Sequence, residues 1–558
     1  MDLLALKERR YCFFNELAAC WHYHNKMMLK NMKLNFFSRA ILIGVSIGVS
    51  PILSTAADSE KPVNKTYQLP SSPSDPVFSG NPYSGTFDTN LGVDANLPEL
   101  GDVSQTVLSP LDEQKIADQI MQQVYASDEV VQDAEITDYL QALGNRLVAS
   151  GPDKNQRFNF FVVKDPTINA FAMPGGVVGV HTGLILAANN ESELAGVLGH
   201  EIGHVTQHHL ARMLAAQKYD TFKNLAGIAL ALLVARSNPE LASGALTASS
   251  AFTVQNQLDY TREHEREADR VGLQILSNAG FDVRGMPSFF TTMQRGNRFS
   301  EGSAPSFLRT HPLTTERISD VTNRVEQMPY KQVPDTFEFQ LVRAKLRASA
   351  TFGDRQSVQS TIDLFLQNIK ERRYVNEAAE HYGLAVAYLN KNALTQAQTE
   401  VDWLKKNAPA HPMIEALFAR ILVAKNNPQL VEQQYAAALK KFPENRALIY
   451  GQAEHFLGVK KPDVAIKFLN DKQVLYPQDP YFYELKARTY AMQGKKLQSH
   501  QALGEAYFRK YDLKRALEQM DLAAKSKDGD FYQQSIVEAR LKELQRLVDD
   551  EKKAKNAS

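Results

Sequence analysis

The chain has 558 residues, of which 44% are apolar and 23% charged, and its formal net charge at pH 7 is zero. This length exceeds what one ordinary hydrophobic core needs, so we expect a globular protein of two or more domains and exclude a disordered chain. The balanced charge, without a basic stripe or a long acidic tail, argues against nucleic acid as a partner.

The first 57 residues form a distinct leader. A 14-residue, mainly apolar run extends from Ala40 to Leu53, with basic residues before it and small residues after it. This order is typical of a signal peptide, and we predict cleavage after Ala56 or Ala57. The run is shorter than the roughly 20 residues of a membrane-spanning helix. Residues 1–31 are interpreted as an upstream extension.

Both cysteines, Cys12 and Cys20, lie in this leader. The mature chain would therefore contain no thiol and no disulfide, which avoids oxidative mispairing in an exported protein. The leader carries seven basic and three acidic residues, so its removal would leave a mildly acidic chain of net charge −4.

The next segment, 58–109, is rich in Ser, Pro, Asn, Asp and Gly, which predicts a flexible N-terminal arm. Apolar residues then recur at helical spacing over 109–149. Two later runs, Phe158–Val163 and Asn169–Gly183, have the composition of strands, and a Pro-Gly-Gly turn divides the second. We therefore expect a small sheet.

Part of that second run, Val177–Val180, permits two interpretations. An edge strand beside a peptidase site can bind a substrate as an added strand through main-chain hydrogen bonds. The same residues equally suit an ordinary hairpin. The sequence does not separate the two.

A His-Glu-x-x-His pattern follows the predicted sheet, formed by His200, Glu201 and His204. It lies in a stretch predicted to be one helix from Glu191 to Gln217. On a helix the two histidines stand one turn apart on one face, so both imidazoles can reach one metal ion. Catalytic zinc takes three protein ligands and keeps a fourth position for water, so another element must supply a His, Asp or Glu.

The segment after this helix contains an apolar run, residues 225–235, that is too short to span a bilayer. We interpret the run as a buried helix, with peripheral membrane contact or a substrate-covering role as the alternative. Residues 237–250 are expected to form a loop near the site. A second helix is predicted from Thr253 to Asn278, closed by Gly280.

Acidic residues are densest on this second helix, between Glu263 and Asp269. The His-Glu-x-x-His pattern, followed about 60 residues later by Glu-x-x-Ala-Asp, resembles the zinc metallopeptidase family that includes the CAAX prenyl endopeptidases and their bacterial relatives. The resemblance implies that Glu265 is the third ligand of one zinc ion and that Asp269 supports a ligand histidine. Glu201 is then the catalytic base in peptide-bond hydrolysis.

The segment from Thr310 to Arg317 resembles the Thr-His-Pro…Arg segment that follows the second helix in this family. In periplasmic members the corresponding histidine can close the open position of the zinc. We therefore predict His311 as a displaceable fourth ligand that keeps the enzyme latent. The alternative is that His311 only starts a helix ahead of Pro312.

Four other histidines are weaker candidates. His208 and His209 extend the first helix, and we expect an exposed or hydrogen-bonded face for both. His264 points about 100° away from Glu265 around the helix and is excluded as a ligand. His181 contacts either substrate or nothing.

The C-terminal third repeats with a period of 34 residues, the length of a tetratricopeptide unit. Small, large and proline positions recur in register: Ala385, Ala419, Ala453 and Ala487; Tyr388, Leu422, Phe456 and Tyr490; Pro409, Pro443 and Pro477. The small residue lets two helices approach, the large one fills the gap, and proline ends each pair. Further helical pairs are expected before Tyr374 and after Asp512.

The expected fold class is α+β: a mainly helical, zincin-type metallopeptidase domain with a small sheet (110–330), then an all-α tetratricopeptide solenoid (331–558). The resemblance implies a periplasmic zinc endopeptidase that cleaves misassembled outer-membrane proteins and assists their assembly. The repeats would dock protein substrates and the outer-membrane assembly machinery. The alternative is a chaperone or assembly scaffold whose peptidase domain is largely latent.

Overall fold

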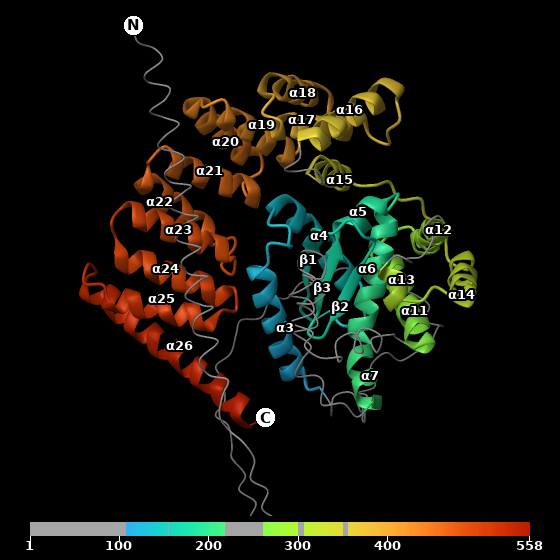
Figure 1. The fold of residues 1–558 in the computed structure, drawn as a ribbon, viewed down its shortest axis with the longest axis horizontal. Helices are drawn as coiled ribbons and strands as arrows, with labels where there is room; N and C mark the ends of the chain where they lie inside the picture. Colours follow the sequence, from blue (N-terminus) through green and yellow to red (C-terminus); the bar gives the residue numbers. More distant parts are fainter. Residues whose placement is uncertain (1–107, 155, 218–260, 299–305, 350–354, 558) are drawn as a thin grey trace, which may run out of the picture. The chain divides into compact units, whose positions relative to one another are not determined.

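The computed structural model describes residues 108–154, 156–217, 261–298, 306–349 and 355–557. This part of the chain is mainly helical and contains one small sheet near its start (Figure 1). Among its helices none is long and apolar enough to cross a membrane. The predicted leader, most of the arm, the apolar run 225–235 and the loop 237–250 lie outside the described residues.

The helical pattern predicted over 109–149 forms two helices, α3 (Pro110–Ala126) and α4 (Ala134–Val148). Each begins at a capping residue, because the side chains of Ser109 and Asp133 accept hydrogen bonds from main-chain amides of the first turn. One face of each helix is buried, as the apolar spacing predicted.

The sheet contains β1 (Asn159–Val163), β2 (Ala170–Met173) and β3 (Val177–His181), in the order β1-β3-β2. β3 pairs in parallel with β1 and antiparallel with β2. The turn between β2 and β3 needs glycine, since Gly175 and Gly176 have φ values of 73° and 78°. The predicted sheet and hairpin are confirmed.

Of the two interpretations of Val177–Val180, the substrate-binding edge is wrong, because β3 is the central strand and has partners on both sides. The edge strand next to the metal-motif helix is β2. Apolar composition identified the strands but carried no information on their order, since the crossover after β1 decides it.

After the short α5 (Thr182–Ala187), the metal-motif helix α6 covers Glu191–Thr206, and α7 covers His209–Gln217. The prediction of one continuous helix over 191–217 is wrong. The amide of His208 bonds back only three residues, to Val205, and His208 adopts a left-handed φ of 49°. Neither Gly nor Pro marks this break in the sequence.

The second predicted helix corresponds to α11 (Arg262–Asn278), which begins at the cap Thr261 and ends before Gly280, whose φ is 77°. Its predicted start, at Thr253, falls outside the described residues. Three helices follow: α12 (Gly285–Arg298), α13 (Ser306–Thr310) and α14 (Thr315–Glu326).

Helix α6 packs against β2, α4, α11 and α12 and is buried along almost its whole length. It meets α11 main chain to main chain. A Cβ atom on Gly203 would lie 3.0 Å from the carbonyl oxygen of Ala268, and one on Gly272 would lie 2.9 Å from the amide nitrogen of His200. This close approach brings acidic residues of α11 beside the histidines of α6.

The remaining helices form consecutive pairs: α15 (Phe337–Ser349) and α16 (Arg355–Glu371); α17 (Glu377–Asn390) and α18 (Leu394–Asn407); α19 (Pro412–Ala424) and α20 (Pro428–Lys441); α21 (Arg446–Gly458) and α22 (Pro462–Gln473); α23 (Pro480–Met492) and α24 (Lys496–Arg509); α25 (Leu513–Lys525) and α26 (Phe531–Ala557). The four repeated alanines lie buried in α17, α19, α21 and α23, and the repeated prolines follow α18, α20 and α22. The predicted 34-residue units and the additional pairs at both ends are confirmed, and the array is a tetratricopeptide-type solenoid.

Candidate metal centre

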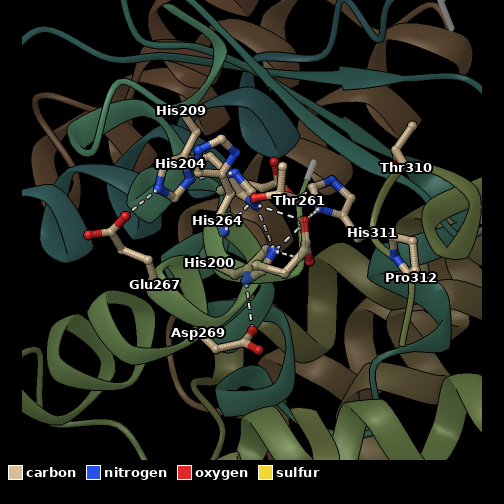
Figure 2. Close-up of polar contacts among 12 residues, drawn as sticks. His200, His204, His209, Thr261, His264, Glu267, Asp269, Thr310, His311 and Pro312 are labelled. Atoms are coloured by element: carbon tan, nitrogen blue, oxygen red, sulfur yellow. Dashed lines mark hydrogen bonds and ion pairs between the residues drawn. The ribbon is translucent and has the colours of Figure 1, made fainter. Parts of the chain in front are cut away.

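Four buried side chains converge on one point. His200 and His204 come from α6, Glu265 from the first turns of α11, and His311 from the segment after α13. One nitrogen or oxygen atom of each lies within 4.8 Å of the corresponding atom of every other, and Figure 2 shows His200, His204 and His311 close together. The group is able to hold one metal ion.

The distances within this group fit tetrahedral coordination. His200 Nε2 lies 3.0 Å from His204 Nε2 and 3.3 Å from His311 Nδ1, while Glu265 Oε1 lies 3.3 Å from His204 Nε2 and 2.9 Å from His311 Nδ1. Ligands about 2.0–2.1 Å from a tetrahedral metal are about 3.3 Å from one another. The donor atoms also suit zinc, which binds imidazole nitrogens and carboxylate oxygens: the group offers three imidazoles and one carboxylate.

Glu201 lies beside this group without belonging to it. Its carboxylate is fully buried, 3.5 Å from His311 Nε2, and neither oxygen accepts a hydrogen bond from the described part of the chain. Burial raises the pKa of this carboxyl, while the neighbouring His311 and His200 lower it in part. A carboxylate without protein donors is available to a water molecule at the centre.

Behind His200 lies a buried ion pair between Asp269 and Arg317. Asp269 Oδ1 is 2.9 Å from His200 Nδ1, and the guanidinium of Arg317 donates to both Asp269 oxygens at 2.8 Å. Burial alone would raise the pKa of Asp269, but the bonds to His200 and Arg317 hold it below its ordinary value. Burial alone would lower the pKa of His200, and its contacts with Asp269 and Glu265 raise it to about 9.

Arg317 also connects the metal-binding group to the segment that carries His311. Its Nη1 atom lies 2.5 Å from Glu265 Oε2 and donates to the carbonyl oxygen of Pro312 at 2.9 Å. The side chain is only 2% exposed. The sequence indicates no role for Arg317, because nothing in its spacing shows that its side chain turns inward from α14.

His311 does not start a helix, so that alternative is wrong: α13 ends at Thr310, and α14 begins at Thr315 with Thr314 as its cap. The imidazole stacks on Phe307, with ring centroids 4.6 Å apart, and its main-chain amide donates to the Phe307 carbonyl. These contacts aim Nδ1 of His311 at Glu265 and Nε2 at Glu201.

Of the weaker candidates, His264 is absent from the metal-binding group, as predicted. His208 is partly exposed and lies 3.3 Å from Glu113. His181 is buried and its Nδ1 lies 2.9 Å from the hydroxyl of Thr167. His209 is hydrogen-bonded, as one branch of the prediction stated, but it is fully buried against His204.

Comparison with known proteins supports a peptidase. Residues 134–325 match the model of peptidase family M48. The chain is 31% identical to the beta-barrel assembly-enhancing protease of Yersinia pestis over 81% of this chain and 92% of that protein, and 29% identical to the Escherichia coli K12 protein of that name over the same shares.

A Vibrio cholerae relative to which the same name is provisionally given is 37% identical over 313 residues, which are 56% of this chain and 64% of that protein. The family match includes every member of the metal-binding group. It also includes Glu201, Asp269 and Arg317. Together with the intact His-His-Glu group, these similarities establish that the chain belongs to peptidase family M48 and is a metallopeptidase.

Proposed function

We propose that the protein is a zinc endopeptidase in which His200, His204 and Glu265 hold the metal. The observation that carries the proposal is the close approach of these side chains: the two histidine Nε2 atoms lie 3.0 Å apart, and each lies 3.3–3.5 Å from an oxygen of the Glu265 carboxylate. Such spacing suits donors that share one zinc ion. We assign the peptidase to residues 110–330 and the repeat domain to residues 331–558.

A bound zinc ion would polarise the scissile carbonyl and make water acidic enough to attack at neutral pH. Glu201 accepts the proton of the attacking water and passes it to the leaving amine. Asp269 Oδ1 lies 2.9 Å from Nδ1 of His200, and this contact favours the tautomer that presents Nε2 to the centre. The reaction therefore needs no covalent enzyme intermediate.

We assign the binding of the substrate's main chain to β2. In the antiparallel pair, the bond from the His181 amide to the Asn169 carbonyl sets the alternation, so Ala170 and Ala172 direct their main-chain groups away from β3. Within the described residues β3 is the only strand next to β2. An extended peptide can add to this edge. A small cavity lined by Met173 and His204 adjoins it.

His311 is assigned as a displaceable fourth ligand that keeps the peptidase latent. Its Nδ1 atom completes the tetrahedral group, and its ring lies against Glu201. In this position the imidazole occupies the place that water or a substrate carbonyl needs. Cleavage then requires that the segment after α13 moves.

We further propose a periplasmic location and misassembled outer-membrane proteins as clients. Support comes from the signal-peptide pattern at Ala40–Ala57 and from the names of two relatives. This chain aligns with 92% of the length of each. The solenoid would dock clients and the assembly machinery, because stacked helical pairs present extended surfaces to proteins. A chaperone or scaffold with a seldom-used peptidase is the second candidate.

The test compares wild-type protein from Asp58 onward with Glu201→Gln, using zinc content and cleavage of casein. Glu201→Gln should keep stoichiometric zinc and lose about 10²–10⁴-fold in cleavage rate, since a general base contributes that much. Glu263→Gln is the matched control, because Glu263 is exposed on α11, and it should cleave normally.

Absence of stoichiometric zinc from the wild type, or undiminished cleavage by Glu201→Gln, would overturn the peptidase mechanism. The same variant separates the two candidates in cells. Loss of every effect on outer-membrane assembly supports the peptidase, and full retention supports the scaffold.

A further inference from the structure

His209 lies beneath a metal-binding histidine because the helix breaks before it. On a continuous helix His209 would point about 140° away from His204, five residues earlier. The turn at His208 restarts the chain as α7 and brings the His209 ring inward, with a ring-centroid distance of 4.9 Å to His204. His209 is 0% exposed, whereas its neighbour His208 is partly exposed.

Three groups form a chain from the metal centre toward the surface. His204 presents Nε2 to the centre, and its other nitrogen, Nδ1, lies 3.0 Å from Nδ1 of His209. His209 Nε2 in turn lies 3.0 Å from a carboxylate oxygen of Glu267 on α11. The same oxygen accepts from Arg212 Nη1 at 2.9 Å, and Figure 2 shows Glu267 beyond the two rings.

The chemistry of these contacts assigns a position to each proton. The Glu267 carboxylate only accepts, so His209 carries its proton on Nε2 and has a lone pair on Nδ1. A bond between two Nδ1 atoms needs one proton, and His204 must therefore supply it. His204 Nε2 is then left with a lone pair that faces Glu265 and His200. This is the only tautomer of His204 that can bind a metal through Nε2.

We propose that His209, held by Glu267, is a positioning residue that fixes the tautomer and the ring orientation of His204. The role corresponds to that of Asp269 behind His200, but it is filled by a neutral imidazole instead of a carboxylate. The inference rests on the proposed metal site. It adds a residue that touches neither substrate nor metal.

The experiment uses two isosteric replacements in the full mature chain, His209→Asn and His209→Leu. The Asn amide oxygen can stand near the position of Nδ1 and accept from His204, whereas Leu has the same shape and accepts nothing. For each variant, zinc affinity is measured by competition with a chelator, and the absorption spectrum is recorded after loading with Co²⁺.

We expect His209→Leu to bind zinc about 10–100-fold more weakly than the wild type, with a shifted Co²⁺ spectrum. His209→Asn should stay within about threefold, with a spectrum close to that of the wild type. A merely structural role predicts the reverse, because an apolar Leu is tolerated better than Asn at a buried position. Equal zinc affinities for the two variants would overturn the proposal.

If His209→Leu does not fold, His209→Gln replaces it, because Gln reaches Glu267 but not His204. The positioning role then predicts tight zinc binding by His209→Asn and weak binding by His209→Gln, and the opposite order contradicts it. Failure of the proposed function has a different signature. In that case the wild type itself takes up no zinc.

Discussion

The metal centre has two parts that are built differently. Its three ligands stand on the long helices α6 and α11, whose main chains come into contact at glycine residues. Buried polar side chains contact these ligands on the side away from the metal position. Its fourth member, His311, stands after a helix of five residues, α13. The first part is fixed by main-chain packing, while the second depends on a few side-chain contacts.

Because of this difference, one part of the centre retains the metal and the other controls the access of water and substrate to it. Three ligands satisfy zinc in a catalytic site, so the α6 and α11 part should hold the metal without His311. The segment of His311 can then move without dissolving the centre. Arg317 belongs to both parts, since it bonds to Asp269 and Glu265 on α11 and also to the Pro312 carbonyl.

The largest effect is therefore expected from Arg317→Met. The substitution leaves the buried carboxylates of Asp269 and Glu265 without their cation, and loss of one partner of a buried pair costs about 3–5 kcal/mol. The free energy of unfolding, measured in denaturant, should fall by that amount in metal-free protein. Zinc should recover part of the loss, because the ion also neutralises Glu265.

Arg317→Lys is the matched control for this prediction. Lys keeps the charge but cannot donate to both Asp269 oxygens and to Pro312 in one planar fork. We expect its stability to lie between those of the wild type and Arg317→Met. Equal stability of all three proteins would show that Arg317 does not join the two parts.

A smaller effect is expected from Gly272→Ala, which tests the main-chain contact of the fixed part. The added Cβ would lie 2.9 Å from the His200 amide nitrogen and 3.0 Å from the Gly199 carbonyl carbon, so α6 and α11 must separate. We expect a loss of about 1–3 kcal/mol in stability and weaker zinc binding. Thermal unfolding and zinc competition measure the two effects.

Gly458→Ala provides the comparison for Gly272→Ala. A Cβ at this helical position would meet nothing within 4 Å, and Gly-to-Ala there should be neutral or stabilising by up to about 1 kcal/mol. If Gly272→Ala behaves in the same way, the fixed part does not depend on close helix contact.

The fixed part is also the part that the sequence predicts well. The four-residue spacing of His200 and His204 is a local helical feature, and the apolar faces of the neighbouring helices follow from short-range patterns. The role of Glu265 and of Asp269 came from family resemblance. The structure brings both beside the histidines because α6 and α11 meet at glycines.

What the sequence did not predict depends on long-range geometry. The left-handed turn at His208 has no Gly or Pro to mark it, so one continuous helix was predicted and the burial of His209 against His204 was missed. The order of the strands depends on a crossover, so the sequence could not separate the two interpretations of Val177–Val180 or identify β2 as the edge next to α6. The inward direction of Arg317 depends on the packing of α14 against α11 and α12.

The smallest structural effect, and the one that tests access, is expected from His311→Ala. The substitution removes the imidazole but leaves the three ligands on α6 and α11 and all contacts of Arg317 unchanged. Zinc content should therefore stay at one ion per chain. Cleavage of casein should rise, because the fourth position and Glu201 then face water and substrate.

Thr310→Ala is the control for this change, since it alters the same segment and leaves the imidazole in place. It should cleave at the wild-type rate. Loss of zinc from His311→Ala would mean that His311 belongs to the fixed part as a permanent ligand. An unchanged cleavage rate with full zinc would mean that the imidazole does not limit access, and the distinction between the two parts would then concern packing alone.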